Sequence, residues 1–205
     1  LVAFCQSSQV RPFLPMMLNK TRLQYTGELT FRGKPVNRKN PISAMYISGS
    51  DMLIETMSIA ENLSVIQNRG GFHFLYNPGK VKATMQNFLK ELQLPFDADV
   101  PLSELTPSQK YILLLTKAIL LDVPIIVLDN LSQQCSRDHY AWILQLIQRY
   151  KNKGRTFILL SNDRNFLIEK CDRIYFCRGK RVVDMLFQDE CTDDIFYEIL
   201  FGHQI

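Results

Sequence analysis

The sequence predicts an α/β fold in which a mainly parallel sheet is covered by helices. From residue 107 onward, strand-like and helix-like segments alternate along the chain. The strand-like segments are nearly unbroken apolar runs, such as PIIVLD at residues 124–129, and strands of this kind are buried on both faces in parallel sheets. Residues 57–105 interrupt the alternation because their apolar residues recur with a helical period. We therefore predict an α/β core of residues 1–56 and 106–205 and an inserted helical subdomain at 57–105.

Each element follows from local pattern and from the turn residues that bound it. Branched and aromatic runs predict strands at 1–4, between the turn glycines Gly27 and Gly33, and at 43–48, 124–129, 156–161, 173–177 and 181–186. Helical periodicity predicts helices at 13–18, 57–66, 80–93, 107–121, 137–152, 163–170 and 192–201. Residues 178–180 (RGK) form the expected hairpin between the last two strands.

Composition excludes several classes of protein. The 205 residues are 46% hydrophobic, which is ample for a buried core. The net charge of +4 is spread along the chain without a Lys/Arg block, which argues against nucleic acid as the main partner. No apolar stretch approaches the roughly 20 residues that a membrane-spanning helix needs.

The cysteines indicate the redox state of the protein, and the first residues indicate how the chain begins. Five cysteines without a C-x-x-C pair are typical of a reduced protein, so we expect free, buried thiols. The chain begins with Leu1, and its first residues already read as a strand. We therefore expect a fragment of a longer protein in which N-terminal strands are missing.

The turn after the first strand is where a doubly wound sheet would bind phosphate. It reads CQSSQVRP, residues 5–12. Against the phosphate-loop pattern G-x-x-x-x-G-K-[ST], Cys5 and Val10 replace the glycines, and Arg11 and Pro12 replace the lysine and the hydroxyl residue. Val10 resists the backbone angles that a phosphate nest uses, and Pro12 lacks both an N–H and a Mg²⁺-binding hydroxyl. We predict that residues 5–12 do not form a phosphate nest.

The order of the downstream motifs resembles the ATP-binding cassette family of transporter ATPases. LSELTPSQK is similar to that family's signature motif, IIVLDN to its Walker B strand, and LLSN and DRIYFCRGK to its switch strand and final hairpin. GELTFRGKPV, MSIAENL and TDDIFYEILFGH resemble the second cassette of tandem ribose/galactose-type sugar import ATPases. The resemblance implies a P-loop NTPase-like cassette fold for nearly the whole chain.

The resemblance also assigns positions to the machinery for ATP and Mg²⁺. Asp129 stands at the Mg²⁺-binding aspartate, Asn130 at the catalytic carboxylate, and Asn162 at the switch histidine. Residues that would still contact nucleotide are Ser7, Ser8, Arg11, Thr106, Gln109 and Asp129. In the signature, Pro107 and Ser108 replace two glycines, although a helix can still begin at Pro107 with Thr106 as its N-cap.

Two readings of Asp129 stay open from the residues. Either Asp129 contacts metal or nucleotide, or it is a vestigial acid at the end of a strand. We expect the second reading and doubtful ATP binding, because the phosphate loop and the catalytic carboxylate have both been replaced.

The resemblance implies a cytoplasmic protein at the inner face of the cell membrane. Its partners would be another cassette and a membrane permease, with no nucleic acid. We predict a degenerate cassette that acts as the structural or regulatory half of a dimer in a sugar-type importer. The alternatives are a working ATP-hydrolysing subunit and an interaction or sensor module that reuses the fold without transport.

Overall fold

The structure is a computed structural model, and it describes residues 1–5, 26–37, 42–49, 52–65, 77–179 and 181–201. The chain divides into two compact units. We call the first the sheet unit; it comprises Leu1–Ser48, Val123–Gln133 and Tyr140–Ile205. The second, the helical unit, comprises Gly49–Asp122 and Gln134–His139. The predicted helix at 13–18 lies outside the described residues.

A six-stranded sheet forms the sheet unit, in the order β4-β5-β6-β1-β7-β8. All neighbouring strands run parallel except β7 and β8, which are joined by the predicted hairpin. The prediction of a mainly parallel sheet is confirmed. The strands are β1 (Val2–Cys5), β4 (Ala44–Ile47), β5 (Ile125–Asp129), β6 (Thr156–Leu160), β7 (Arg173–Arg178) and β8 (Arg181–Phe187).

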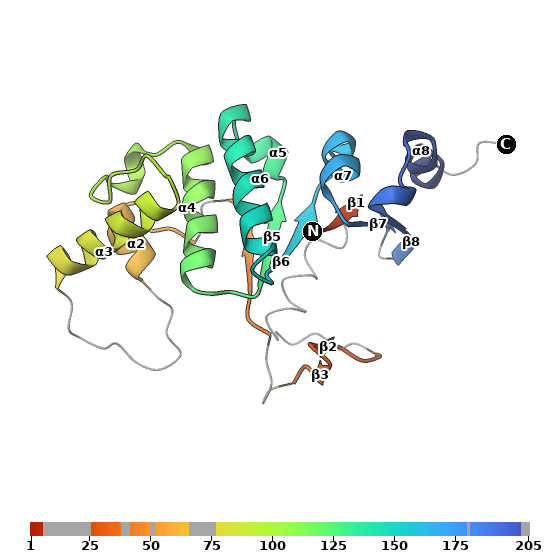
Figure 1. The fold of residues 1–205 in the computed structure, drawn as a ribbon, viewed down its shortest axis with the longest axis horizontal. Helices are drawn as coiled ribbons and strands as arrows, with labels where there is room; N and C mark the ends of the chain where they lie inside the picture. The colour runs from red at the N-terminus through yellow and green to blue at the C-terminus, as the bar shows by residue number, and fades with distance from the viewer. Residues whose placement is uncertain (6–25, 38–41, 50–51, 66–76, 180, 202–205) are drawn as a thin grey trace. The chain divides into compact units, whose positions relative to one another are not determined.

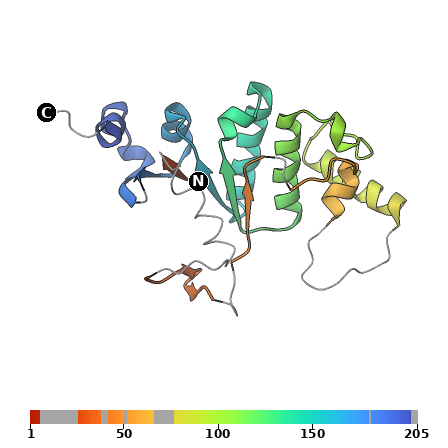
Figure 2. The ribbon, with the colours of Figure 1, turned by 180° about the vertical axis from the view of Figure 1, so that it is seen from behind.

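A long helix of the sheet unit covers one face of the sheet at β5 and β6. In α6 (Arg137–Lys151), the buried residues Ile143, Leu146, Ile147 and Tyr150 recur at helical spacing. Along the strands β5 and β6, α6 lies in front in Figure 1 and behind in Figure 2. The remaining helices of this unit are α5 (Leu131–Gln134), α7 (Arg164–Lys170), η2 (Gln188–Glu190) and α8 (Asp193–Phe201).

One face of the sheet carries an apolar cluster. Its buried members are Ile42, Ile125, Val127 and Leu160. A hairpin of β2 (Thr30–Phe31) and β3 (Lys34–Pro35) contributes Phe31 to this cluster. The sequence predicts one strand between Gly27 and Gly33. Two short strands form instead, because Arg32 and Gly33 both have positive φ angles (51° and 74°), as in a type I′ turn.

The helical unit contains α2 (Ile59–Ser64), α3 (Pro78–Glu91), η1 (Leu102–Glu104) and α4 (Pro107–Leu120). Ser58 and Glu61 form a capping box at the start of α2. Within the described part of residues 57–105, the one strand-type pairing is an isolated bridge between Ser58 and Pro101. The assignment of 57–105 as an inserted helical subdomain stays a prediction.

Among the helices in the described ranges, none has the length and apolar character needed to cross a membrane.

Candidate functional site

The carboxyl ends of four parallel strands come level with one another in the sheet unit. Asp129, the last residue of β5, lies opposite Leu160, the last residue of β6. Leu160 is in turn opposite Phe4 of β1, and Ile47 of β4 is opposite Leu128. Ligands of open α/β sheets bind beyond this edge. The fold therefore brings the ends of β4, β5, β6 and β1 to the place where a nucleotide site is expected.

Asp129 is almost fully buried at this edge, with 6% of its surface exposed. The Tyr46 hydroxyl donates a hydrogen bond to Asp129 Oδ2 at 2.5 Å. Tyr46 pairs in register with Val127, and alternate residues of a strand share a face, so Tyr46 and Asp129 lie on the same face of the sheet. A buried carboxylate needs such a donor, because burial without a hydrogen bond is costly.

Asn130 begins the turn that follows β5. Its backbone has a positive φ of 52°, its N–H donates to the carbonyl oxygen of Leu160 at 3.0 Å, and its carbonyl oxygen accepts from the N–H of Gln133 at 3.0 Å. Asn is enriched in this left-handed conformation relative to most non-glycine residues. The Asn130 side chain is an amide, so it has no carboxylate with which to act as a general base.

The segment after β6 is anchored on both sides of Asn162. The Ser161 N–H donates to the carbonyl oxygen of Phe4 at 3.3 Å, and Ser161 Oγ accepts from the N–H of Asp163 at 3.0 Å. Asp163 then caps α7 by accepting from the N–H of Phe166 at 3.3 Å. Asn162 itself is exposed. The two sequence-predicted positions Asn130 and Asn162 thus follow neighbouring strands at the same edge.

The signature-like stretch lies in the helical unit, at the start of α4. The prediction that Thr106 is the N-cap and that Pro107 is the first helical residue is confirmed. Gln109 Oε1 accepts from the Thr106 N–H at 2.9 Å and from the Thr106 hydroxyl at 3.0 Å, while Thr106 Oγ1 accepts from the Gln109 N–H at 3.3 Å. The Thr106 hydroxyl and the Gln109 side chain are therefore engaged with each other in a capping box.

Ser108, which replaces a glycine of the family's signature, makes side-chain contacts that a glycine could not make. Its Oγ lies 2.7 Å from His139 Nδ1 and accepts from the N–H of Ser136 at 3.2 Å. Cys135 also contacts the Ser108 hydroxyl, and burial raises the pKa of the Cys135 thiol to about 11 in spite of that contact. These contacts brace the start of α4 against residues 135–139 inside the helical unit.

At the carboxyl edge, Asp129 is the carboxylate that the resemblance assigns to Mg²⁺ binding. Mg²⁺ in nucleotide sites is held by carboxylate and hydroxyl oxygens together with substrate phosphates. Asp129 Oδ2 is already bound to the Tyr46 hydroxyl, and Asn130 supplies an amide in place of a carboxylate. Among the described residues, no group of three or more His, Cys, Asp or Glu could hold a metal ion. Ser7, Ser8 and Arg11 lie outside the described residues, so the expectation about the phosphate loop stays a prediction.

Sequence reasoning missed two features of these sites. One is the Tyr46–Asp129 hydrogen bond, although both residues lie near the carboxyl ends of their strands. The other is the contact between Ser108 and His139, whose partners are 31 residues apart. Neither contact has a sequence signal without knowledge of strand order and helix packing.

Comparison with known proteins supports the resemblance. No family model matches the chain. It is 24% identical over 185 residues to the ribose import ATP-binding protein RbsA of Jannaschia sp., and 21% identical over 187 residues to the galactose/methyl galactoside import ATP-binding protein MglA of Pasteurella multocida. Each match covers 87% of this chain and 36% of the relative. The chain thus spans just over a third of the length of these relatives.

Solved structures agree on the fold. A nucleotide-free ATP-binding cassette from an ABC transporter superposes with a TM-score of 0.77 at 16% identity, covering 98% of this chain and 87% of that one. The protein cbiO1 of Clostridium perfringens, part of the transporter complex cbiONQ, gives a TM-score of 0.73 at 18% identity, covering 97% and 80%. The fold is that of an ATP-binding cassette, as the sequence motifs predicted, and the sequence resembles sugar import ATP-binding proteins.

Proposed function

We propose that this chain is a degenerate ATP-binding cassette of a sugar-type importer. It acts as the structural or regulatory half of a cassette dimer that couples to a membrane permease, at the cytoplasmic face of the membrane. Two findings support the proposal: the similarity to ribose and galactose import ATP-binding proteins, and the cassette fold.

The proposed loss of ATP hydrolysis rests on the side chains at the carboxyl edge of the sheet. At the edge where a cassette would hold Mg²⁺–ATP, the hydroxyl of Tyr46 binds Asp129, and the next residue is Asn130 in place of an acid. ATP hydrolysis in such enzymes depends on charge stabilisation by the metal and on a residue that orients water. Without both, bound nucleotide would not be turned over at a useful rate.

The test is calorimetric titration of the purified chain with ATP, with and without Mg²⁺, together with a phosphate-release assay. We expect no ATPase activity above background and at most weak, Mg²⁺-insensitive binding. Micromolar, Mg²⁺-dependent affinity accompanied by phosphate release would overturn the proposal and establish a working ATPase. Asp129→Ala would then be expected to abolish that affinity.

A further inference from the structure

The last described segment of the chain carries a negative charge, although the chain as a whole is basic. Residues 182–201 contain six acidic residues and no Lys, Arg or His, whereas the net charge of the whole chain is +4. All six acids are exposed, and they are Asp184, Asp189, Glu190, Asp193, Asp194 and Glu198. This part of the sheet unit therefore presents a negative surface to solvent.

The helix α8 adds aromatic rings to this negative surface. Four of its exposed residues recur at helical spacing and share one face. We call this face the α8 stripe, and its members are Asp194, Tyr197, Glu198 and Phe201. On the opposite side of the helix, the buried Phe196 packs edge-on against Phe176 of β7 at a centroid distance of 5.2 Å. The sheet thus holds α8 by its inner side and leaves the α8 stripe facing outward.

The two rings of the α8 stripe are stacked on each other and exposed. Their centroids are 5.9 Å apart, with an angle of 14° between the ring planes. Tyr197 is 46% exposed and Phe201 is 65% exposed. Single exposed apolar residues are common on protein surfaces, but these two form a continuous aromatic surface beside carboxylates of the same helix face. Exposed aromatic residues in such a cluster are typical of the centre of a protein interface.

Arg164 of α7 shows which chemical group fits an acid and an aromatic ring of α8. Its guanidinium group forms an ion pair with Asp193 and lies over the Tyr197 ring, 4.8 Å from the ring centroid. The α8 stripe offers a second ring in Phe201 and a second carboxylate in Asp194. Cations of a partner can bind these two groups in the way that Arg164 binds the first two.

We propose that the α8 stripe binds a basic amphipathic helix of a partner protein. Residues at positions i, i+3, i+4 and i+7 form a ridge that fits the face of a second helix. Apolar side chains of the partner cover the rings of Tyr197 and Phe201. Lys or Arg side chains on either side of them pair with the carboxylates of residues 182–201.

The sign of the charge decides against other occupants. Nucleic acids and anionic lipid surfaces have the same sign as residues 182–201, so this surface repels them. In a symmetric dimer, the α8 stripe of one copy would face the same stripe of the second copy. Such a dimer would bring carboxylates of like charge together. A basic helix complements both the rings and the charge.

The test is fluorescence polarisation of a labelled peptide titrated with the full chain. The peptide has roughly 18 residues, enough to form a helix, with Leu along one face and Lys and Arg on both sides of that face. Phe201→Ala is expected to weaken binding about tenfold, the effect of losing an aromatic residue at the centre of an interface. Asp194→Asn is expected to weaken binding about threefold, and to make it less sensitive to salt.

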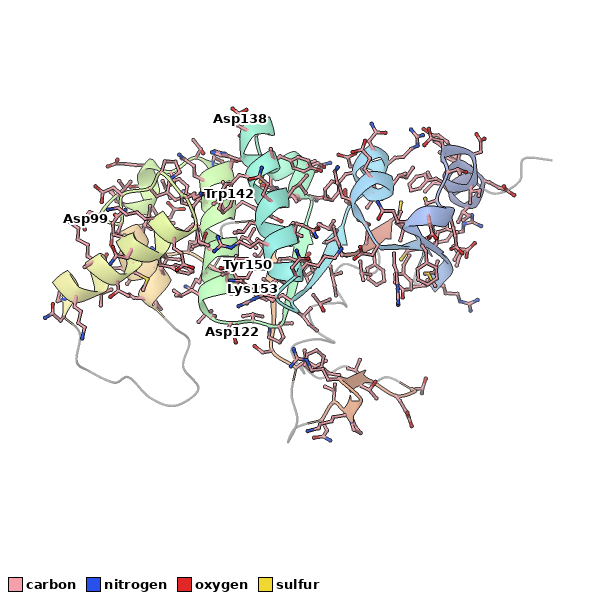
Figure 3. All side chains as sticks on the ribbon, in the orientation of Figure 1. Asp99, Asp122, Asp138, Trp142, Tyr150 and Lys153 are labelled. Carbon is pink, nitrogen blue, oxygen red and sulfur yellow. The ribbon has the colours of Figure 1, made fainter. Side chains whose placement is uncertain are left out.

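Two matched controls lie in the helical unit. Met52→Ala removes an apolar side chain that is 46% exposed. Asp138→Asn removes an exposed carboxylate in the first turn of α6, labelled in Figure 3. Both variants should bind the peptide as the parent chain does. A second peptide with Glu in place of every Lys and Arg should not bind, and circular dichroism checks that each variant is folded.

The outcomes separate the basic helix from other occupants. The proposal is overturned if the basic peptide does not bind, if the acidic peptide binds equally well, or if Met52→Ala weakens binding as much as Phe201→Ala. Sedimentation of the chain alone tests a second copy as the occupant. A dimer that Phe201→Ala dissociates would assign the α8 stripe to self-association and would also overturn the proposal. These measurements need no nucleotide, so their outcome is independent of ATP binding.

Discussion

The Tyr46 hydroxyl is hydrogen-bonded to the buried carboxylate of Asp129 at the carboxyl edge of the sheet. This bond gives the strand-end acid a partner from within the protein. The contribution of this hydrogen bond to the free energy of unfolding can be measured without a ligand, by changing Tyr46.

Tyr46→Phe removes the hydroxyl donor and leaves the rest of the ring in place. We expect the free energy of unfolding to fall by about 1–3 kcal/mol, the cost of a lost hydrogen bond to a buried charged group. Urea denaturation measures the change. The control is Tyr175→Phe on the same sheet face, where the ring stacks on Phe4 at a centroid distance of 5.1 Å. An equal loss in the two variants would show that the Asp129 contact is energetically unimportant.

Asn130→Glu restores a carboxylate at the catalytic position of the family. We expect no ATPase activity, because Val10 and Pro12 are predicted to prevent the phosphate loop from holding Mg²⁺–ATP. We also expect a loss of stability of about 1 kcal/mol, since the left-handed backbone at Asn130 suits Asn and Gly better than Glu. Phosphate release by Asn130→Glu above the rate of the parent chain would contradict the prediction.

Ser108 and His139 should be coupled energetically. A double-mutant cycle of Ser108→Ala, His139→Ala and the double variant is expected to give a coupling energy of about 0.5–1.5 kcal/mol in the free energy of unfolding. The two side chains are 2.7 Å apart, so a direct hydrogen bond is the physical cause. Additive effects of the two substitutions would mean that the contact does not contribute to stability in solution.

Thiol reactivity should follow burial. Burial raises the pKa of Cys171 to about 12 and that of Cys135 to about 11. At pH about 8 neither forms much thiolate, so both should react with a disulfide reagent more slowly than in the unfolded chain, where a thiol has a pKa of about 8.5. Cys135 should react first because Cys5, Cys171, Cys177 and Cys191 are buried. Cys135→Ser should remove this first phase, and rapid reaction of a second thiol in the folded protein would contradict the assignment.

The same shift predicts a pH dependence of stability. The folded-state pKa of Cys171 lies above its unfolded value, so the neutral thiol stabilises the fold fully below pH about 8.5. That contribution is lost as the pH rises toward about 12. Urea midpoints measured across this range should fall more for the parent chain than for Cys171→Ala, relative to each protein's own midpoint at neutral pH. Parallel pH profiles would contradict the shift.

The sequence alone determined most of the longer elements and the class of fold. The apolar run 124–129 predicted a strand buried on both faces, and the alternation after residue 107 predicted parallel strands joined by helices. Capping residues such as Thr106 and Pro107 act over a few neighbours, so their effects can be read locally. The replacements at Val10, Pro12 and Asn130 are equally visible in the sequence.

Only the tertiary structure decided which distant groups meet. The hydroxyl of Tyr46 reaches Asp129 because β4 pairs with β5 in a particular register, and a shift of one residue would turn Tyr46 to the other face. Ser108 meets His139 through helix packing, which brings together two residues that are 31 positions apart. Such contacts depend on strand order, strand register and helix packing. Local sequence patterns do not specify these, because they relate only residues that are close together along the chain.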